Sequence, residues 1–243
     1  GEGGNLGLTQ HGRIEFALDG GRINTDFIDN SAGVDCSDHE VNIKILLDQA
    51  VAAGRLDLRR RNSLLREMAD EVEALVLRSN YLQTQALSMM ESLTSKRLGA
   101  EAHFITMLEH QGVIDRDLED LPDEEQLRDR VSRGLGLMRP ELAVLFSFSK
   151  ITLYQDLVAS EVPEDPYLSR ELEDYFPTQL RSEFADLMAE HRLKREIIAT
   201  RVTNNLVNRM GAYFAVRIKE DTGADSATVA KAYTVAREIF EAR

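Results

Sequence analysis

The chain has 243 residues, 43% hydrophobic and 6% aromatic, with a formal net charge of −13 at pH 7; this length and hydrophobic content allow a sizeable buried core. The strong negative charge argues against nucleic-acid binding, because phosphate contacts require clustered lysine and arginine. The single cysteine excludes an internal disulfide, and no apolar run is long enough to cross a membrane, so we expect a cytoplasmic protein.

Residues 1–35 are the part of the sequence with strand character. The segments "GRIEFAL" at 12–18 and "RINTDFI" at 22–28 are short, rich in branched or aromatic residues, and separated by a turn at 19–21. They predict a β-hairpin that needs a larger sheet, because an isolated two-stranded ribbon is only marginally stable. The glycine-rich start "GEGGNLGLTQ" resembles the end of a strand that has been cut away, so we expect a fragment of a longer protein.

A helical period begins at Asp35 and stops at Gly54. A second, long helix is expected to begin near Asp57. Its apolar positions keep an alternating three-four spacing, which predicts lengthwise packing against another helix, in a bundle core or in an intermolecular coiled coil. These positions are Leu65, Met68, Val72, Leu75, Leu82, Ala86, Met89 and Leu93.

The second half of the sequence continues as helices. One helix is expected over 95–111, followed by a polar connection in which Asp123 can cap the next helix. The segment 139–158 has a proline in its first turn and is apolar nearly all round, so it is expected to be the most buried helix. Three further helices are expected over 178–191, 193–219 and 226–241.

The stretch "DNSAGVDCSDHE" at 29–40 contains the only cysteine, a histidine and several carboxylates. Cys36 and His39 are spaced like one half of a zinc site, but zinc requires three or four convergent ligands and no second cysteine–histidine cluster exists. The same pair could form a nucleophile and its base on one helical face. A small buried cysteine is the more ordinary alternative. We expect no metal site here.

A third interpretation uses more of these residues. The turn "NSAG" leads into a helix that begins near Asp35 or Ser37, and Glu40 follows Ser37 at the spacing of a capping box. The free N–H groups of a helix N-terminus, together with a hydroxyl group, can bind a carboxylate ligand. This interpretation predicts a carboxylate-binding site at the start of the helix.

Two of these motifs occur in the order found in a known family. "EGGN" (Glu2–Asn5) followed by "INTDFIDNSAGVDCSDHE" (Ile23–Glu40) resembles the end of the nucleotide-binding domain of glutamate dehydrogenases. That family carries an E-G-A-N turn, a strand ending in P-D, and then N-A-G-G-V-x-x-S-Y-x-E. The segments "RPELAVL" and "VTNNLVNRMG" extend the resemblance to the large bacterial NAD-specific branch. For that branch it covers essentially the whole chain.

The resemblance implies oxidation of L-glutamate to 2-oxoglutarate and ammonium, with NAD as hydride acceptor, by a cytoplasmic homo-oligomer. By position, Asn5 and Asn30 would bind the nicotinamide-ribose end of NAD. Ser37 would hold the side-chain carboxylate of glutamate, and Gly33 and Val34 would shape that pocket.

The sequence departs from the family pattern at two positions and omits its catalytic groups. Ala32 replaces the second glycine, and Asp38 replaces a tyrosine and adds a carboxylate beside a carboxylate pocket. The family's catalytic lysine, its acid/base aspartate and its phosphate-binding loop would lie upstream of Gly1. We therefore expect no catalytic residue within the chain and no dehydrogenase activity of the isolated chain.

The expected fold class is mainly α, with a helical bundle-like C-terminal region and a small β remnant of a Rossmann-type domain at the N-terminus. Residues 1–120 would complete the catalytic region, and residues 121–243 would form a helical C-terminal domain. An alternative function stays open, because residues 121–243 show no catalytic pattern. They would then form a helical interaction, oligomerisation or regulatory module without its own catalysis.

Overall fold

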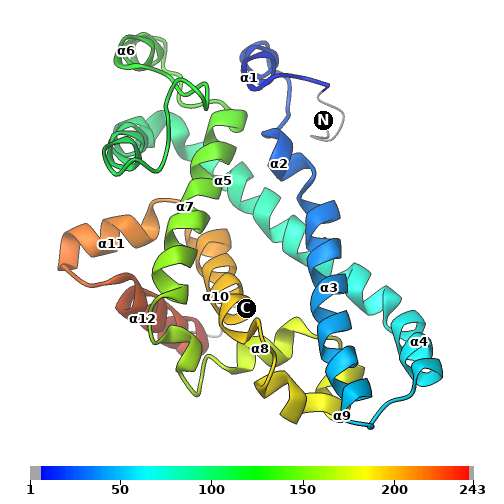
Figure 1. Ribbon diagram of the computed structural model, residues 1–243. Helices are drawn as coiled ribbons and strands as arrows, with labels where there is room; N and C mark the ends of the chain where they lie inside the picture. The colour runs from blue at the N-terminus through cyan, green and yellow to red at the C-terminus, as the bar shows by residue number, and fades with distance from the viewer. Residues whose placement is uncertain (1–6, 241–243) are drawn as a thin grey trace. The chain divides into compact units, whose positions relative to one another are not determined.

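The computed structural model describes residues 7–240, and these residues are mainly helical (Figure 1). The described range contains no β-strand. None of its helices is both long enough and apolar enough to span a bilayer. The elements are α1 Gln10–Leu18, α2 Asp26–Asp29, α3 Ser31–Ala52, α4 Leu58–Glu67, α5 Ala69–His110, α6 Glu124–Ser132, α7 Arg139–Val158, the 3-10 helix η2 Val162–Glu164, α8 Arg170–Tyr175, α9 Thr178–Ala189, α10 Lys194–Met210, α11 Phe214–Thr222 and α12 Ser226–Ile239.

The hairpin predicted near the N-terminus is wrong, because its first strand is the helix α1. The hydroxyl of Thr9 accepts the backbone N–H of Gly12 at 3.1 Å and so caps the helix. Arg13 and Ile14 are buried, whereas strand alternation would place them on opposite faces. Residues 21–25 have no regular secondary structure. A strand there would need a neighbouring strand for its backbone groups, and the described residues supply none.

The chain divides into two compact units, each assembled from separate stretches of sequence. The first unit contains the residues up to Ser31 together with 82–153 and 206–224. The second unit contains 32–81, 154–205 and the residues from Asp225 onward.

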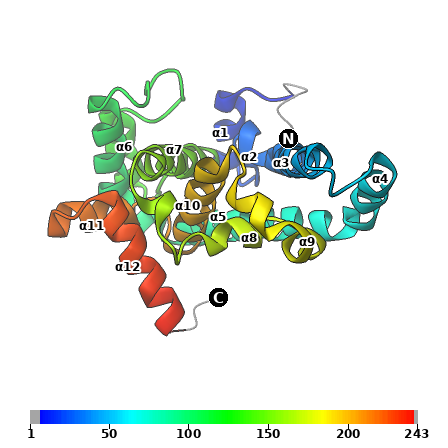
Figure 2. The same ribbon diagram turned by 60° about the horizontal axis from the view of Figure 1, so that its bottom comes forward.

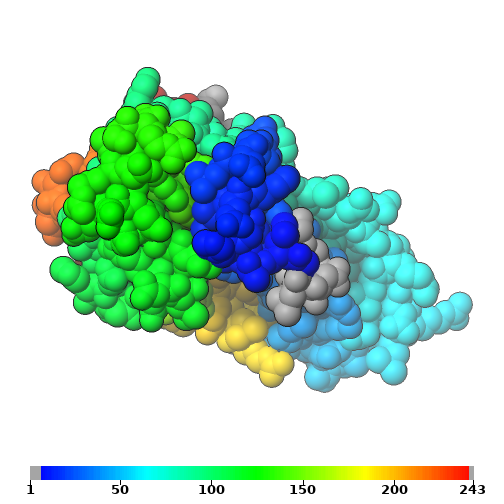
Figure 3. Space-filling view, turned by 90° about the horizontal axis from the view of Figure 1, so that it is seen from above, coloured from blue at the N-terminus to red at the C-terminus, as the bar shows by residue number. Residues whose placement is uncertain are grey.

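The first unit has its core around the N-terminal half of α7. Every residue from Arg139 to Phe146 is buried, which confirms the deep burial predicted for this part of the helix; further along, Ile151 is 44% exposed. On the part of α5 that belongs to this unit, Leu87, Leu98 and Leu108 are buried. Figure 3 shows α1 against the segment that precedes α6, where His11 Nδ1 lies 3.9 Å from Asp120 Oδ1.

The second unit is built from α3, α4, α8, α9 and α12, with parts of α5, α7 and α10. Leu46, Leu47 and Ala50 of α3 are completely buried. Arg55, just beyond α3, donates hydrogen bonds to the Asp186 carboxylate at 2.6 Å and to the Glu183 carbonyl at 2.7 Å in α9. Figure 2 shows α8 running into α9.

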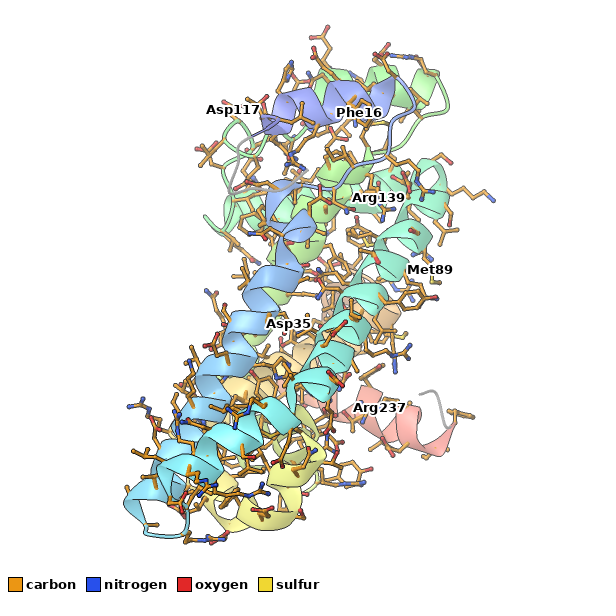
Figure 4. All side chains as sticks on the ribbon, turned by 90° about the vertical axis from the view of Figure 1, so that its right-hand side faces the viewer. Phe16, Asp35, Met89, Asp117, Arg139 and Arg237 are labelled. Atoms are coloured by element: carbon orange, nitrogen blue, oxygen red, sulfur yellow. The ribbon has the colours of Figure 1, made fainter. Side chains whose placement is uncertain are left out.

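The long helix predicted from Asp57 is two helices. Asp57 caps α4, and Met68 lies between α4 and the 42-residue α5. The predicted apolar seam is only partly correct, since Ala86 is buried but Met89 is 58% exposed and its neighbour Met90 is buried (Figure 4). The helix expected over 95–111 is the last part of α5.

Most predicted helix ends agree with the structure. Asp123 forms a capping box with Gln126 at the start of α6, and Gly112, just beyond α5, has a positive φ of 68°. The helix expected over 193–219 is divided into α10 and α11, because Gly211 adopts a φ of 83° between them.

Gly136, in the loop before α7, lies against Thr94 of α5. A Cβ atom at Gly136 would lie 2.4 Å from Thr94 Cγ2 and 2.6 Å from the Thr94 carbonyl carbon, and the latter cannot move aside. We expect Gly136→Ala to lower the free energy of unfolding by about 1–3 kcal/mol through overpacking. In the control Gly99→Ala, the new methyl group meets open space within α5. That variant is expected to gain about 0.5–1 kcal/mol. Urea unfolding of both variants checks the opposite signs.

Candidate functional site

Asn30 lies between α2 and α3. Its backbone N–H donates to the Asp26 carbonyl at 3.0 Å, so the main chain of this half-buried residue is held at the end of α2. Its side-chain amide makes no hydrogen bond to any residue in the described range 7–240. The fixed backbone therefore carries a carboxamide that is available for another molecule. Asn5, the other predicted cofactor residue, lies outside the described residues.

The helix that follows begins earlier than predicted. Because α3 starts at Ser31, Ser37 lies in its second turn rather than at its N-terminus. The Ser37 hydroxyl donates to the Val34 carbonyl at 2.8 Å, and Glu40 pairs with Lys44 one turn further on. The predicted capping box at Ser37 and Glu40 is therefore wrong. The small residues of "SAG" continue the helix instead of forming a turn.

Three of the predicted site residues share one side of α3. Gly33 precedes Ser37 by four residues and Val34 precedes it by three, so all three lie on one face. Each of them is exposed, Val34 at 55%. This face offers a hydroxyl, an apolar wall and, at Gly33, a position without a side chain.

Asp38 points to another side of α3 from Ser37. Consecutive helical residues are separated by about 100° around the axis. Burial raises the pKa of the Tyr175 hydroxyl in α8, and the carboxylates of Asp38 and Asp35 raise it further. Asp38 itself is exposed. Asp38 follows Val34 by four residues, so its carboxylate borders the face that carries Val34 and Ser37.

His39 and Cys36 do not form a catalytic pair. The His39 ring is 5% exposed and stacks on Tyr175 at a centroid distance of 4.2 Å. Burial, together with Arg201, lowers the pKa of His39 to about 4. Its Nε2 atom is 3.8 Å from Asp35 Oδ1, too far for a hydrogen bond that would hold a proton.

Cys36 is exposed and has no hydrogen bond to His39. Among residues 7–240 no three or more histidine, cysteine, aspartate or glutamate side chains are grouped as metal ligands would be.

A polar network in the first unit was not predicted from the sequence. Arg139 donates to Asn24 Oδ1 at 2.8 Å and to Glu91 Oε2 at 2.8 Å. Arg13, which is 1% exposed, donates to Asp29 Oδ2 at 2.9 Å. These side chains surround a shallow pocket of about 250 Å³, lined by Arg22, Ile23, Asn24, Asp29 and Arg139. Figure 4 labels Arg139 within this network.

The polar network fixes the N-terminal segment rather than forming an anion site. Glu91 Oε2 accepts from Arg139 and also lies 3.4 Å from Arg22 Nη2, so a carboxylate of the chain already occupies the place between these two arginines. The signal in the sequence was the arginine directly before Pro140 in "RPELAVL". Its partners come from more than 40 residues away, and no local pattern reveals them.

Comparison with known proteins identifies the family. Residues 1–90 match the family model for the catalytic domain of bacterial NAD-glutamate dehydrogenase, and residues 134–243 match the model for the C-terminal part of glutamate dehydrogenase. An NAD-specific glutamate dehydrogenase of Halomonas elongata is 54% identical over 99% of this chain. This chain belongs to the bacterial NAD-specific glutamate dehydrogenases.

Other members of this family show the same coverage. The NAD-specific glutamate dehydrogenases of Pseudomonas aeruginosa and Mycobacterium tuberculosis are 53% and 44% identical, each over 99% of the chain. The chain spans about 15% of the length of these relatives. Asn5, Asn30, Gly33, Val34 and Ser37 all fall within the stretch that matches the catalytic domain of the family.

Proposed function

We propose that this chain forms part of an NAD-dependent glutamate dehydrogenase, which converts L-glutamate, NAD and water to 2-oxoglutarate, ammonium, NADH and a proton. The observation that carries this proposal is the 54% identity, over 99% of the chain, with a protein named as an NAD-specific glutamate dehydrogenase. The match of residues 1–90 to the catalytic domain of that family supports a role beside the reacting groups rather than a purely structural one.

Asn30, together with Asn5, would hold the nicotinamide-ribose end of NAD. A carboxamide carries both donors and an acceptor, which suits the hydroxyl groups of a ribose. The Asn30 amide fits this role, since its backbone is held at the end of α2 and its side chain has no partner within residues 7–240. When bound, NAD supplies the hydride acceptor, and the role of Asn30 is to orient it.

Ser37 would bind the side-chain carboxylate of glutamate. Because it lies in the second turn of α3, the helix dipole contributes little there, and the hydroxyl itself must supply the recognition. On binding, its proton would turn from the Val34 carbonyl to the carboxylate, which replaces a neutral hydrogen bond with a stronger charge-assisted one. Gly33 leaves room one turn earlier, and the Val34 side chain lines the apolar part of the ligand.

The substitution Ser37→Ala in the full-length enzyme tests this proposal. Loss of a charge-assisted hydrogen bond, about 1.5–3 kcal/mol, is expected to raise the KM for glutamate about 10- to 100-fold. The KM for NAD should stay unchanged. Ser92→Ala is the matched control, because the exposed Ser92 hydroxyl also donates to the carbonyl three residues earlier, at 2.7 Å. If the KM for glutamate is the same in Ser37→Ala and Ser92→Ala, Ser37 does not bind the substrate.

The division into residues 1–120 and 121–243 is part of the same proposal. The catalytic-domain match ends at residue 90 and the C-terminal match begins at residue 134, on either side of this boundary. A Rossmann-type strand is proposed for residues 22–25 only, in the full-length protein. Its support is the extended backbone at Thr25, with φ −77° and ψ 162°.

We propose further that the full-length protein is a homo-oligomer in the bacterial cytoplasm. The end of α12 supports assembly, because Val235, Ile239 and Phe240 are 57%, 69% and 80% exposed. Exposed apolar side chains that are close together on a helix are typical of a contact surface. The sequence has one cysteine and therefore no internal disulfide, which supports a reducing compartment.

A further inference from the structure

We propose that Gln83 is a positioning residue for NAD binding, which acts through Ser31 to hold the turn that presents Asn30. The proposal rests on the cofactor role of Asn30 stated above. Gln83 lies on α5 and Ser31 is the first residue of α3, and both belong to the first unit together with Asn30.

A chain of hydrogen bonds joins three helices to this turn. Lys150 Nζ of α7 donates to Gln83 Oε1 at 2.8 Å. Gln83 Nε2 donates to the Ser31 hydroxyl oxygen at 2.9 Å, and that hydroxyl donates to the Ile28 carbonyl at 2.8 Å. The first two links connect segments that lie 67 and 52 residues apart in the sequence, and the third is local.

The direction of every bond in this chain is fixed. An ammonium group only donates, so the oxygen of the Gln83 amide must face Lys150 and its nitrogen must face Ser31. The Ser31 hydroxyl therefore accepts from Gln83, and its proton goes to Ile28. Gln83 is 9% exposed and its neighbours Ala86 and Leu87 on α5 are buried. A buried amide that lacks one of its hydrogen bonds costs free energy. The arrangement in which Gln83 bonds both Lys150 and Ser31 is therefore favoured over arrangements that leave one end of the amide unpaired.

The consequence for Asn30 is that it is anchored on both sides. Ser31 is held by Gln83 and Ile28, and Asp29 is held by Arg13 Nη1 at 2.9 Å and by Asn24 Nδ2 at 2.8 Å. The side chain between them makes no hydrogen bond within residues 7–240. A side chain whose backbone is already fixed loses little conformational freedom when it binds NAD. It therefore binds NAD more tightly than the same side chain on a mobile backbone would.

This arrangement assigns Gln83 an indirect role. It does not need to touch NAD, since its effect is transmitted by the Ser31 hydroxyl. The prediction that distinguishes positioning from simple stabilisation is selectivity. Loss of the link should weaken NAD binding and leave glutamate binding nearly unchanged, because Ser37 lies in the second turn of α3, where the hydrogen bonds of the helix itself hold the backbone.

The test uses the full-length enzyme with Gln83→Leu, Ser31→Ala and Ser31→Thr. Gln83→Leu and Ser31→Ala are each expected to raise the KM for NAD about fivefold, as for the loss of one neutral hydrogen bond. The KM for glutamate should change less than about twofold. Ser31→Thr keeps the hydroxyl and should restore the KM for NAD. Because Gln83→Leu and Ser31→Ala break the same hydrogen bond, the double variant should have about the same KM for NAD as either single variant.

Two further variants make the outcome decisive. Gln85→Leu, at an exposed position of the same helix, is the matched control and should leave both KM values unchanged. Asn30→Ala tests the premise: if it leaves the KM for NAD unchanged, the cofactor role of Asn30 fails. If Asn30→Ala raises this KM but Ser31→Ala and Gln83→Leu do not, or raise both KM values alike, the positioning role is overturned. If Gln83→Leu does not fold, the comparison of Ser31→Ala with Ser31→Thr gives the same decision.

Discussion

Glu141→Ala is expected to lower the free energy of unfolding of the chain by about 3–5 kcal/mol, because it leaves a buried arginine without its carboxylate. Arg130 donates to Glu141 through both guanidinium ends, at 2.5 and 2.7 Å. Glu141 is 1% exposed and Arg130 8%. The same carboxylate accepts the backbone N–H of Met138 at 2.5 Å, so its removal also uncaps the start of α7.

Two comparisons identify the cause of this loss. In the double variant Arg130→Met with Glu141→Leu no unpaired charge remains, so most of the lost stability should return. Glu124→Ala breaks an exposed ion pair with Arg128, whose side chains are 86% and 72% exposed, and should change stability by less than about 1 kcal/mol. Urea unfolding of the four proteins measures these differences. A Glu141→Ala variant as stable as Glu124→Ala would contradict a structural role for the buried pair.

The helices that sequence analysis located correctly are those with local end signals. Pro140 and Glu141 mark the first turn of α7, and Asp123 with Gln126 marks α6. The signals depend on neighbouring residues only, so they are visible in one sequence. α1 was missed because "GRIEFAL" alternates like a strand over seven residues, and the capping hydroxyl of Thr9 lies outside that run.

The candidate site was predicted less well than the helices. The resemblance gave the five binding residues, of which the structure describes Asn30, Gly33, Val34 and Ser37. The physical explanation first given for Ser37, a helix N-terminus, is wrong because α3 begins at Ser31. Helix boundaries are the least certain part of a sequence-based expectation, and a start four residues earlier moves Ser37 from the cap to the second turn.

The hydrogen bonds that fix the site region were beyond sequence analysis. Gln83 appears in the sequence as one polar residue on a long helix, without any mark of its contact with Ser31. Arg139 likewise has partners in two distant segments, at Asn24 and on α5. Such contacts depend on how helices pack, and residues more than 40 positions apart carry no shared local pattern.

Glu101 provides the second large expected effect, a loss of stability with rising pH. Its side chain is 1% exposed, and its only hydrogen-bond partner among the described residues is the Thr94 hydroxyl at 2.5 Å. Burial raises the pKa of Glu101 to about 7, with a further contribution from the Glu141 carboxylate, against the opposing effects of Thr94 and Arg97. Burial raises the pKa of the Tyr213 hydroxyl, and the Glu101 charge raises it further.

The sign of the effect follows from proton binding. Between the ordinary pKa of 4.5 and the folded value of about 7, the folded chain binds the Glu101 proton more tightly than the unfolded chain. The contribution of protonated Glu101 to the free energy of unfolding is therefore fully present below pH 4.5 and is lost as the pH rises through 7. The shift corresponds to a loss on the order of 3 kcal/mol.

Glu101→Gln isolates this contribution, because it replaces the carboxyl group with a neutral group of the same shape. Below pH 4.5 the variant should be about as stable as the unaltered chain, and above pH 7 it should be more stable by on the order of 3 kcal/mol. His39 and His191 titrate equally in both proteins, so the difference between the two unfolding curves removes them. Glu73→Gln, at an exposed position of the same helix, should show no such difference. If the difference in unfolding free energy between Glu101→Gln and the unaltered chain stayed constant with pH, the expectation would be wrong. Glu101 would then be ionised in the folded chain, and the Thr94 hydroxyl would stabilise it as a carboxylate.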